Sequence, residues 1–133
     1  MLVGYVTIGT RDLTVSGAFY DELLSLLGAR RVMTDERMLG WGSSPEETMF
    51  SVILPFDQNE ATVGNGTMVA LFAKDPETVE RVYEKALSLG ATDEGHPHDR
   101  GSSMGFYGGY FRDLDGNKLV AYCLNYEPNP MDK

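Results

Sequence analysis

The sequence has little of several features that mark whole classes of protein. It contains a single cysteine, Cys123, so no disulfide forms within the chain and a cysteine-rich zinc site is excluded. No apolar run approaches the roughly 18 residues that a membrane-spanning helix needs. The opening residues lack the basic segment and apolar stretch of a secretory signal, and no phosphate-binding glycine loop or serine-hydrolase elbow is present. These absences predict a cytoplasmic protein.

Basic residues are also scarce. The chain carries 11 Lys and Arg against 20 Asp and Glu, which gives a net charge of −9 with histidine neutral. Such a field repels nucleic-acid phosphates and anionic lipid, so we expect neither nucleic acid nor membrane as a partner. A neutral or cationic small molecule suits this charge better. With 133 residues and 42% hydrophobic residues, the chain is expected to form one globular domain.

The first half of the chain has the order β-α-β-β-β. Asp12 is a helix N-cap residue, an apolar stripe follows at helical spacing, and Gly28 ends the helix. Alternating or β-branched segments on either side predict strands. The expected elements are a strand over Val3–Ile8, a helix from Asp12 to Leu27, and strands over Ala29–Thr34, Met38–Gly42 and Thr48–Leu54.

The second half repeats this order after a polar connector. Asp75 and Pro76 open a helix that Gly90 ends. Asp115-Gly116 within a short connection predicts a hairpin between two strands. The expected elements are strands over Thr67–Ala73 and Ala91–Asp93, a long loop over Gly95–Gly105, and strands over Phe106–Arg112 and Lys118–Leu124.

The two halves also resemble each other in sequence. Leu24-Ser25-Leu26-Leu27-Gly28-Ala29 corresponds to Leu87-Ser88-Leu89-Gly90-Ala91, and Asp12 corresponds to Asp75. One such unit leaves a sheet face uncovered, and two units together close a curved sheet. We therefore predict an α+β fold in which two tandem βαβββ modules form a curved, mostly antiparallel sheet around a central cavity, with the helices outside. The expected single domain covers residues 1–126 (repeat one 1–55, connector 56–65, repeat two 66–126), and 127–133 is a flexible tail.

Several motifs resemble those of the vicinal-oxygen-chelate superfamily, the glyoxalase, bleomycin-resistance and extradiol-dioxygenase group. They are Val6-Thr7-Ile8-Gly9-Thr10-Arg11-Asp12-Leu13, Phe19-Tyr20, Leu26-Leu27-Gly28, Gly64-Asn65-Gly66-Thr67 with Val69-Ala70, and Arg112-Asp113-Leu114-Asp115-Gly116-Asn117-Lys118-Leu119. The resemblance spans about residues 1 to 125. It supports the twin-module fold, but it does not by itself assign an activity.

The resemblance also implies where a divalent ion is held in metal-dependent members. The matching positions are Tyr5 and Met68 on the first strand of each repeat, Val120 on the last strand of the second, and a residue near Ser51 in the first. Zinc, calcium and their neighbours prefer imidazole or carboxylate ligands, which these side chains do not supply. We therefore expect no metal and no other cofactor there, and an apolar, aromatic pocket wall instead.

Both histidines lie in the segment His96-Pro97-His98-Asp99-Arg100. Three interpretations are open: a polar surface loop, a pocket-lining loop in which a histidine transfers protons or binds an anion together with Arg100, and a metal site. The segment leads into a strand expected to line the cavity. We therefore keep His96, His98 and Arg100 as candidate binding residues.

Aromatic residues supply the remaining candidates. Tyr107 lies on a glycine-bracketed aromatic strand, and its hydroxyl requires a partner if it is buried. Trp41, the only tryptophan, is placed either to stack on a planar ligand or to pack in the core or a dimer contact. The candidate binding residues are thus Tyr5, Trp41, Met68, His96, His98, Arg100, Tyr107 and Val120.

Three functions remain open. The first is a small-molecule-binding protein similar to the bleomycin-resistance branch, a homodimer without the usual metal. The second is an enzyme, a lyase, isomerase or dioxygenase, that uses a rebuilt metal site or metal-free acid–base chemistry; no catalytic residue is assigned. The third is a degenerate family member kept for protein–protein contact.

Overall fold

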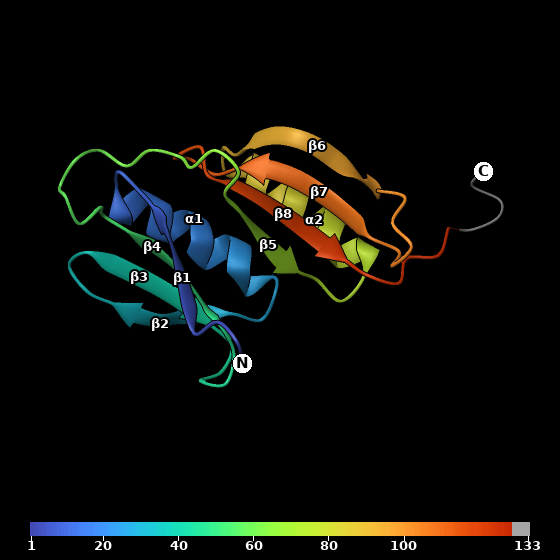
Figure 1. The fold of residues 1–133 in the computed structure, drawn as a ribbon, viewed down its shortest axis with the longest axis horizontal. Helices are drawn as coiled ribbons and strands as arrows, with labels where there is room; N and C mark the ends of the chain where they lie inside the picture. The colour runs from blue at the N-terminus through green and yellow to red at the C-terminus, as the bar shows by residue number, and fades with distance from the viewer. Residues whose placement is uncertain (129–133) are drawn as a thin grey trace. The chain divides into compact units, whose positions relative to one another are not determined.

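The computed structural model describes residues 1–128 as two βαβββ modules. In the first, strand β1 (Tyr5–Gly9) leads to helix α1 (Leu13–Ser25), and strands β2 (Arg30–Thr34), β3 (Met38–Gly42) and β4 (Met49–Ile53) follow. The sheet has the order β1-β4-β3-β2, in which β1 and β4 are parallel and the other pairs antiparallel (Figure 1).

The second module has the same plan. It contains β5 (Met68–Phe72), α2 (Pro76–Ser88), β6 (Thr92–Asp99), β7 (Tyr107–Arg112) and β8 (Lys118–Cys123), with strand order β5-β8-β7-β6. The hydrogen-bonded strands thus form two mixed sheets of four, one for each repeat. The predicted α+β class and the duplicated element order are confirmed.

The helix boundaries follow from the local chemistry of the sequence. The carboxylate of Asp12 accepts a hydrogen bond from the amide of Val15 at 3.1 Å, and Asp75 does the same for Thr78 at 2.8 Å. Each carboxylate satisfies an amide that has no partner within the helix. Gly28 and Gly90 adopt positive φ angles of 77° and 104° after the two helices, a conformation that glycine adopts without steric cost.

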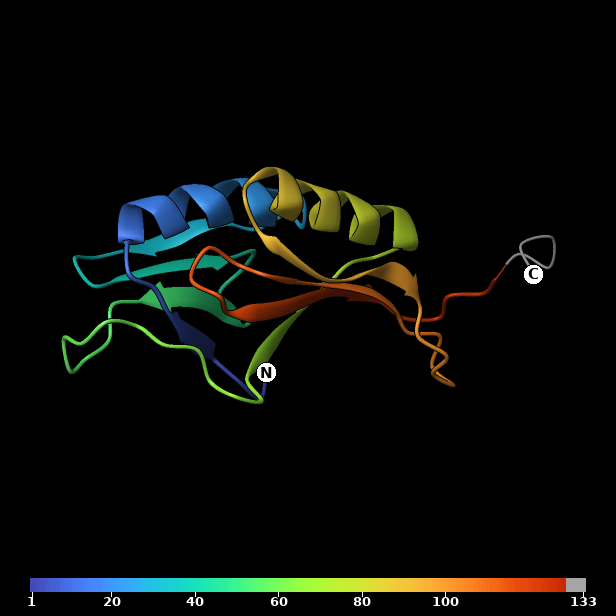
Figure 2. The same cartoon turned by 90° about the horizontal axis from the view of Figure 1, so that it is seen from above.

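Each helix covers one face of its own sheet (Figure 2). Under α1, the rings of Tyr20 and Phe50 lie 4.7 Å apart, and Trp41 lies 5.6 Å from Tyr20. Under α2, Val79, Val82 and Ala86 are fully buried, as are Phe111 and Leu119 of the sheet. The opposite face of each sheet carries no helix, and the candidate site is sought there.

Strand β6 differs from the sequence-based prediction. A short strand over Ala91–Asp93 and a loop over Gly95–Gly105 were expected, whereas β6 runs over Thr92–Asp99 and contains both histidines. Its pairing with β7 shifts register on either side of Gly95, whose φ is 144°. Glycine and proline interrupt the local strand pattern, and only the pairing with β7 makes the segment a strand.

By packing, the chain divides into two compact units. One comprises Met1–Thr67 together with Leu114–Asn117, and the other comprises Met68–Asp113 together with the chain from Lys118 onward. The predicted connector 56–65 falls inside the first unit. A cavity enclosed by both repeats stays a prediction, and most of the predicted tail, 129–133, lies outside the described residues. Within residues 1–128, neither helix is long and apolar enough to cross a bilayer.

Candidate binding face

The strand register decides which side chains share the helix-free face of the second sheet. Val120 lies opposite Ala70 on β5 and Tyr110 on β7, and Tyr122 lies opposite Phe72 and Gly108. Since side chains alternate along a strand, Lys118, Val120 and Tyr122 point to the same side. Leu119 and Ala121 point to the other side, toward α2. Val120 is as fully buried as these two neighbours, whereas Lys118 and Tyr122 are half-buried.

Aromatic rings gather on this helix-free face. Phe106 stacks on Tyr122 with ring centroids 5.0 Å apart and an angle of 6° between the planes. Phe72 meets Tyr122 edge-on at 5.6 Å, and its side chain remains 59% exposed. We call the set Phe72, Phe106, Tyr110 and Tyr122 the aromatic face. Phe72 is exposed and the other three rings are half-buried. Apolar rings that are partly open to solvent side by side are typical of a binding surface.

Gly108 makes this arrangement possible. A Cβ atom at position 108 would lie 2.7 Å from an edge atom of the Phe106 ring and 3.2 Å from a methyl of Val120. Real Cβ contacts are longer, so any side chain there would displace the Phe106 ring. Glycine directly across from Tyr122 therefore leaves the space in which Phe106 stacks.

The edge strand adds polar groups to the same side of the sheet. His98 pairs with Gly108, and its Nδ1 lies 2.7 Å from the carbonyl oxygen of Asp99. Because a carbonyl oxygen only accepts, Nδ1 carries the proton of the neutral ring and Nε2 is left as an acceptor. Arg100 donates to the carbonyls of Gly108, Gly95 and His96, and its guanidinium lies 4.9 Å from the centre of the Tyr110 ring.

The helix-free face of the first sheet carries Tyr5 and Ser51. Tyr5 is 59% exposed and lies opposite Met49 on β4. Ser51 lies opposite Thr7 and Gly40, is fully buried, and its hydroxyl has no hydrogen-bond partner within the described part of the chain. The Met49 side chain covers Gly40, beside Ser51.

The four positions at which the motif resemblance implies a metal carry side chains that do not suit a divalent cation. Tyr5 and Ser51 offer neutral hydroxyls, Met68 a thioether, and Val120 an isopropyl group. Zinc, manganese and nickel are held in proteins mainly by imidazole, carboxylate or thiolate ligands. Among residues 1–128, no group of three or more His, Cys, Asp or Glu side chains is placed to hold a metal ion.

Three sequence candidates lie away from the helix-free faces. Trp41 is 1% exposed, packs under α1, and donates from its indole nitrogen to Asp21 at 2.8 Å. Tyr107 is buried on the α2 side, where its hydroxyl donates to Glu80 at 2.7 Å. His96 meets the edge of the Tyr83 ring at 5.4 Å.

Burial and hydrogen bonding shift several pKa values near α2. Burial, and then the bond to Glu80, raise the pKa of Tyr107 far above its ordinary value. Burial also raises the pKa of the Cys123 thiol. Tyr107 therefore stays protonated as a structural donor, and Cys123 is not activated as a nucleophile.

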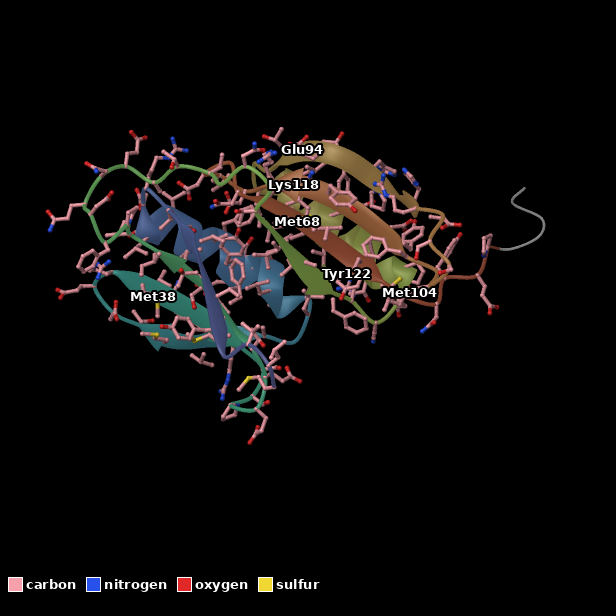
Figure 3. All side chains as sticks on the ribbon, in the orientation of Figure 1. Met38, Met68, Glu94, Met104, Lys118 and Tyr122 are labelled. Atoms are coloured by element: carbon pink, nitrogen blue, oxygen red, sulfur yellow. The ribbon has the colours of Figure 1, made fainter. Side chains whose placement is uncertain are left out.

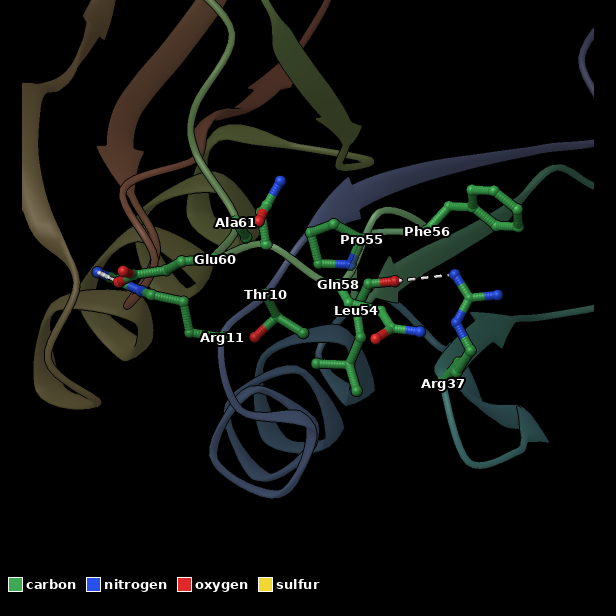
Figure 4. A pocket seen from close by; sticks show the side chains of 10 residues that line it. Thr10, Arg11, Arg37, Leu54, Pro55, Phe56, Gln58, Glu60 and Ala61 are labelled. Carbon is green, nitrogen blue, oxygen red and sulfur yellow. Dashed lines mark hydrogen bonds and ion pairs between the residues drawn. The ribbon is translucent and has the colours of Figure 1, made fainter.

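A separate cleft lies in the first unit (Figure 4). It has a volume of about 930 Å³ and contains none of the predicted site residues. Its lining includes Arg11, which pairs with Asp115 and Glu60, and Arg37, which donates to the carbonyl of Leu54. These groups already have partners, and the connector supplies much of the wall. We therefore place the candidate site on the aromatic face instead.

The sequence analysis named Met68 and Val120 on this face but did not select Phe72, Tyr122 or Lys118. The signal was available, because Tyr122 and Lys118 each lie two residues from Val120 and Phe72 lies four residues from Met68. At period two these residues must share a face. Which face carries the helix was not readable from the alternation alone.

Comparisons with known proteins agree with this architecture. The family model described as Glyoxalase/Bleomycin resistance protein/Dioxygenase superfamily matches residues 2–121. A glyoxalase/bleomycin resistance protein from Albidiferax ferrireducens T118 is 31% identical, with a TM-score of 0.84, and the match covers 96% of this chain and 100% of that one. A comparison with curated proteins finds no match.

Two further solved structures share the fold at lower identity. A glyoxalase/bleomycin resistance protein/dioxygenase family enzyme from Burkholderia phytofirmans PsJN is 18% identical with a TM-score of 0.72, covering 91% of this chain and 97% of that one. A lactoylglutathione lyase from Agrobacterium tumefaciens is 19% identical with a TM-score of 0.65, covering 91% and 92%. At these identities the likeness concerns the fold alone.

Proposed function

Because the chain belongs to the Glyoxalase/Bleomycin resistance protein/Dioxygenase superfamily, we propose that it is a small-molecule-binding protein whose ligand lies on the aromatic face. The ligand is flat and mainly apolar, and the protein holds it in the cytoplasm without converting it. The observation that carries the proposal is the contacting set of Phe72, Phe106 and Tyr122 on a sheet face without a helix, in which Phe72 is exposed and the other two rings are half-buried. Burial of such rings by a planar ligand is favourable.

The proposal includes the absence of a divalent cation from the family's usual positions. Its support is the donor chemistry of Tyr5, Met68 and Val120, which lacks imidazole and carboxylate groups. Equilibrium dialysis against zinc, manganese and nickel is expected to leave less than one tightly held ion per chain. Stoichiometric binding that the Tyr5→Phe and Met68→Leu variants lose would overturn this part.

The binding itself is tested with N-phenyl-1-naphthylamine, a neutral compound with a flat naphthalene ring system whose fluorescence rises in apolar surroundings. Phe72→Ala is expected to weaken its affinity about fivefold, because loss of one aromatic contact costs about 1 kcal/mol. Phe56→Ala is the matched control: Phe56 is also an exposed phenylalanine, at 88%, but it belongs to the first unit. Equal effects of the two substitutions, or no fluorescence change with the unaltered protein, would contradict the proposal.

A second candidate function is metal-free acid–base catalysis on the same face. The observation that favours it is His98, whose Nδ1 bonds to the Asp99 carbonyl and leaves Nε2 as an acceptor. Incubation with 2-hydroxyacetophenone in deuterated water distinguishes the two functions by proton NMR. Exchange of the carbon-bound protons that disappears in the His98→Gln variant supports catalysis, and the absence of exchange supports binding alone.

We also propose that the protein is a homodimer. The support is that β1 and β5 are edge strands, each hydrogen-bonded on one side only within its sheet. Unpaired strand edges favour association with a further strand. Light scattering coupled to gel filtration measures the mass directly, and a mass of 14.7 kDa would reject the dimer.

A further inference from the structure

Lys118 introduces a positive charge beside the aromatic face. It is the first residue of β8 and lies opposite Met68 on β5 (Figure 3). Its ammonium nitrogen lies 5.3 Å from the centre of the Tyr110 ring. Within the described part of the chain it makes no ion pair of 4.0 Å or less with a carboxylate. Its charge is therefore available to a ligand.

Arg100 adds a second cation on the same ring. Its guanidinium donates to backbone carbonyls, which are neutral, and lies 4.9 Å from the centre of Tyr110. The neighbouring Arg112, by contrast, pairs with Glu94. The chain as a whole carries a charge of −9, but two cations lie within 5.3 Å of the centre of the Tyr110 ring. At short range these nearby charges outweigh distant carboxylates, which salt screens.

The spacing of the groups sets the size of the ligand. The Lys118 ammonium lies beside the Tyr110 ring, and Tyr110 lies opposite Val120 in the strand register. The Tyr122 ring belongs to the next residue on the same side of β8, about 7 Å further along the strand. Between them, Ala70 on β5 is exposed and adds only a methyl group to the face, whereas Gly108 lies under the Phe106 ring. A fused aromatic ring system with a terminal anionic group spans this distance.

We infer that the ligand is an aromatic carboxylate whose rings lie against Tyr122 and Phe106 and whose carboxylate is held by Lys118. The inference rests on the proposed function, because it names the ligand class of the same face. It differs from the expectation of a neutral or cationic ligand, which was based on net charge alone. Lys118 acts as the specificity-determining residue, since a carboxylate pairs with an ammonium and a carboxamide does not.

The experiment compares 2-naphthoate with 2-naphthamide, two compounds of nearly the same shape that differ in charge. Isothermal titration calorimetry is expected to give an affinity at least fivefold higher for naphthoate. Lys118→Met is expected to abolish the preference for naphthoate and to leave the naphthamide affinity within about twofold of that of the unaltered protein. Lys118→Arg is expected to keep most of the preference for naphthoate. Lys74→Met is the control, because it removes the same charge from an exposed position outside the strands.

A second measurement uses only the unaltered protein, so that misfolding of a variant cannot affect its result. For the unaltered protein, naphthoate affinity is expected to fall severalfold between 20 and 500 mM sodium chloride, while naphthamide affinity stays constant. Equal affinity for the two compounds, or a preference unchanged in Lys118→Met, would overturn the inference while N-phenyl-1-naphthylamine binding still supports the aromatic face. Failure of all three compounds to bind would reject the proposed function itself.

Discussion

The hydroxyl of Thr10 donates a hydrogen bond of 2.7 Å to the carboxylate of Asp115, a residue 105 positions further along the chain. The other oxygen of the same carboxylate accepts from the Arg11 backbone amide at 2.9 Å and from the Arg11 side chain at 3.2 Å. Thr10 is 1% exposed, and its buried hydroxyl is satisfied by this carboxylate together with the Asp12 backbone, whose carbonyl oxygen lies 3.2 Å away. The carboxylate thereby fastens the Leu114–Asn117 segment to the end of β1, within one compact unit.

We expect Asp115→Ala to lower the free energy of unfolding by about 2 kcal/mol, because hydrogen bonds to charged groups are worth about that much and Asp115 accepts them from both Thr10 and Arg11. Urea denaturation measures the loss. The control is Glu60→Ala, which removes the exposed partner of the same arginine and is expected to cost under about 0.5 kcal/mol. Similar losses in both variants would show that Asp115 is merely another surface carboxylate.

Gly108→Ala tests the aromatic face without removing any ring. The new methyl group displaces Phe106 from Tyr122, so N-phenyl-1-naphthylamine affinity is expected to drop severalfold and stability by about 1–3 kcal/mol. Gly42→Ala is the matched strand control, since its Cβ would meet only a Val32 methyl at 3.9 Å. Unchanged probe binding in Gly108→Ala would mean that the stacked pair is not part of the site.

Tyr83 is expected to make stability depend on pH in the alkaline range. Burial, and then its hydrogen bond to Asp93, raise the pKa of Tyr83 from 10.0 to about 12. The folded protein therefore retains a proton that the unfolded chain loses, so the stabilisation is full below pH 10 and is lost as the pH rises toward 12. Tyr83→Phe should make the decline in unfolding free energy between these values shallower.

The same contact acts in the opposite direction on Asp93. The hydrogen bond from Tyr83 is the main cause that lowers the pKa of Asp93. The ionised carboxylate therefore stabilises the folded protein at any pH above the ordinary pKa of an aspartate, and this stabilisation is lost as the pH falls through the lowered pKa. Urea titrations from pH 3 to 12 on the unaltered protein and on Tyr83→Phe measure both effects. Parallel pH profiles for the two proteins would reject the coupling.

The sequence by itself determined the duplicated element order, because each signal is local. Asp12 and Asp75 cap helices through amides three residues away, and Gly28 and Gly90 end them through their own backbone freedom. The family resemblance also rests on local signals, because its motifs are runs of contiguous residues. The family model that matches residues 2–121 confirms it.

The tertiary structure decided what the side chains face. The alternation of side chains placed Tyr107 and Tyr110 on opposite sides of a strand. Because α2 packs on one of these sides, Tyr107 is a buried hydrogen-bond donor and Tyr110 lies beside Lys118. Trp41 likewise became a core residue because α1 covers its side of the sheet. Segment 95–99 became a strand only through its pairing with β7. Strand pairing and face burial join residues distant in sequence, and no local pattern encodes them.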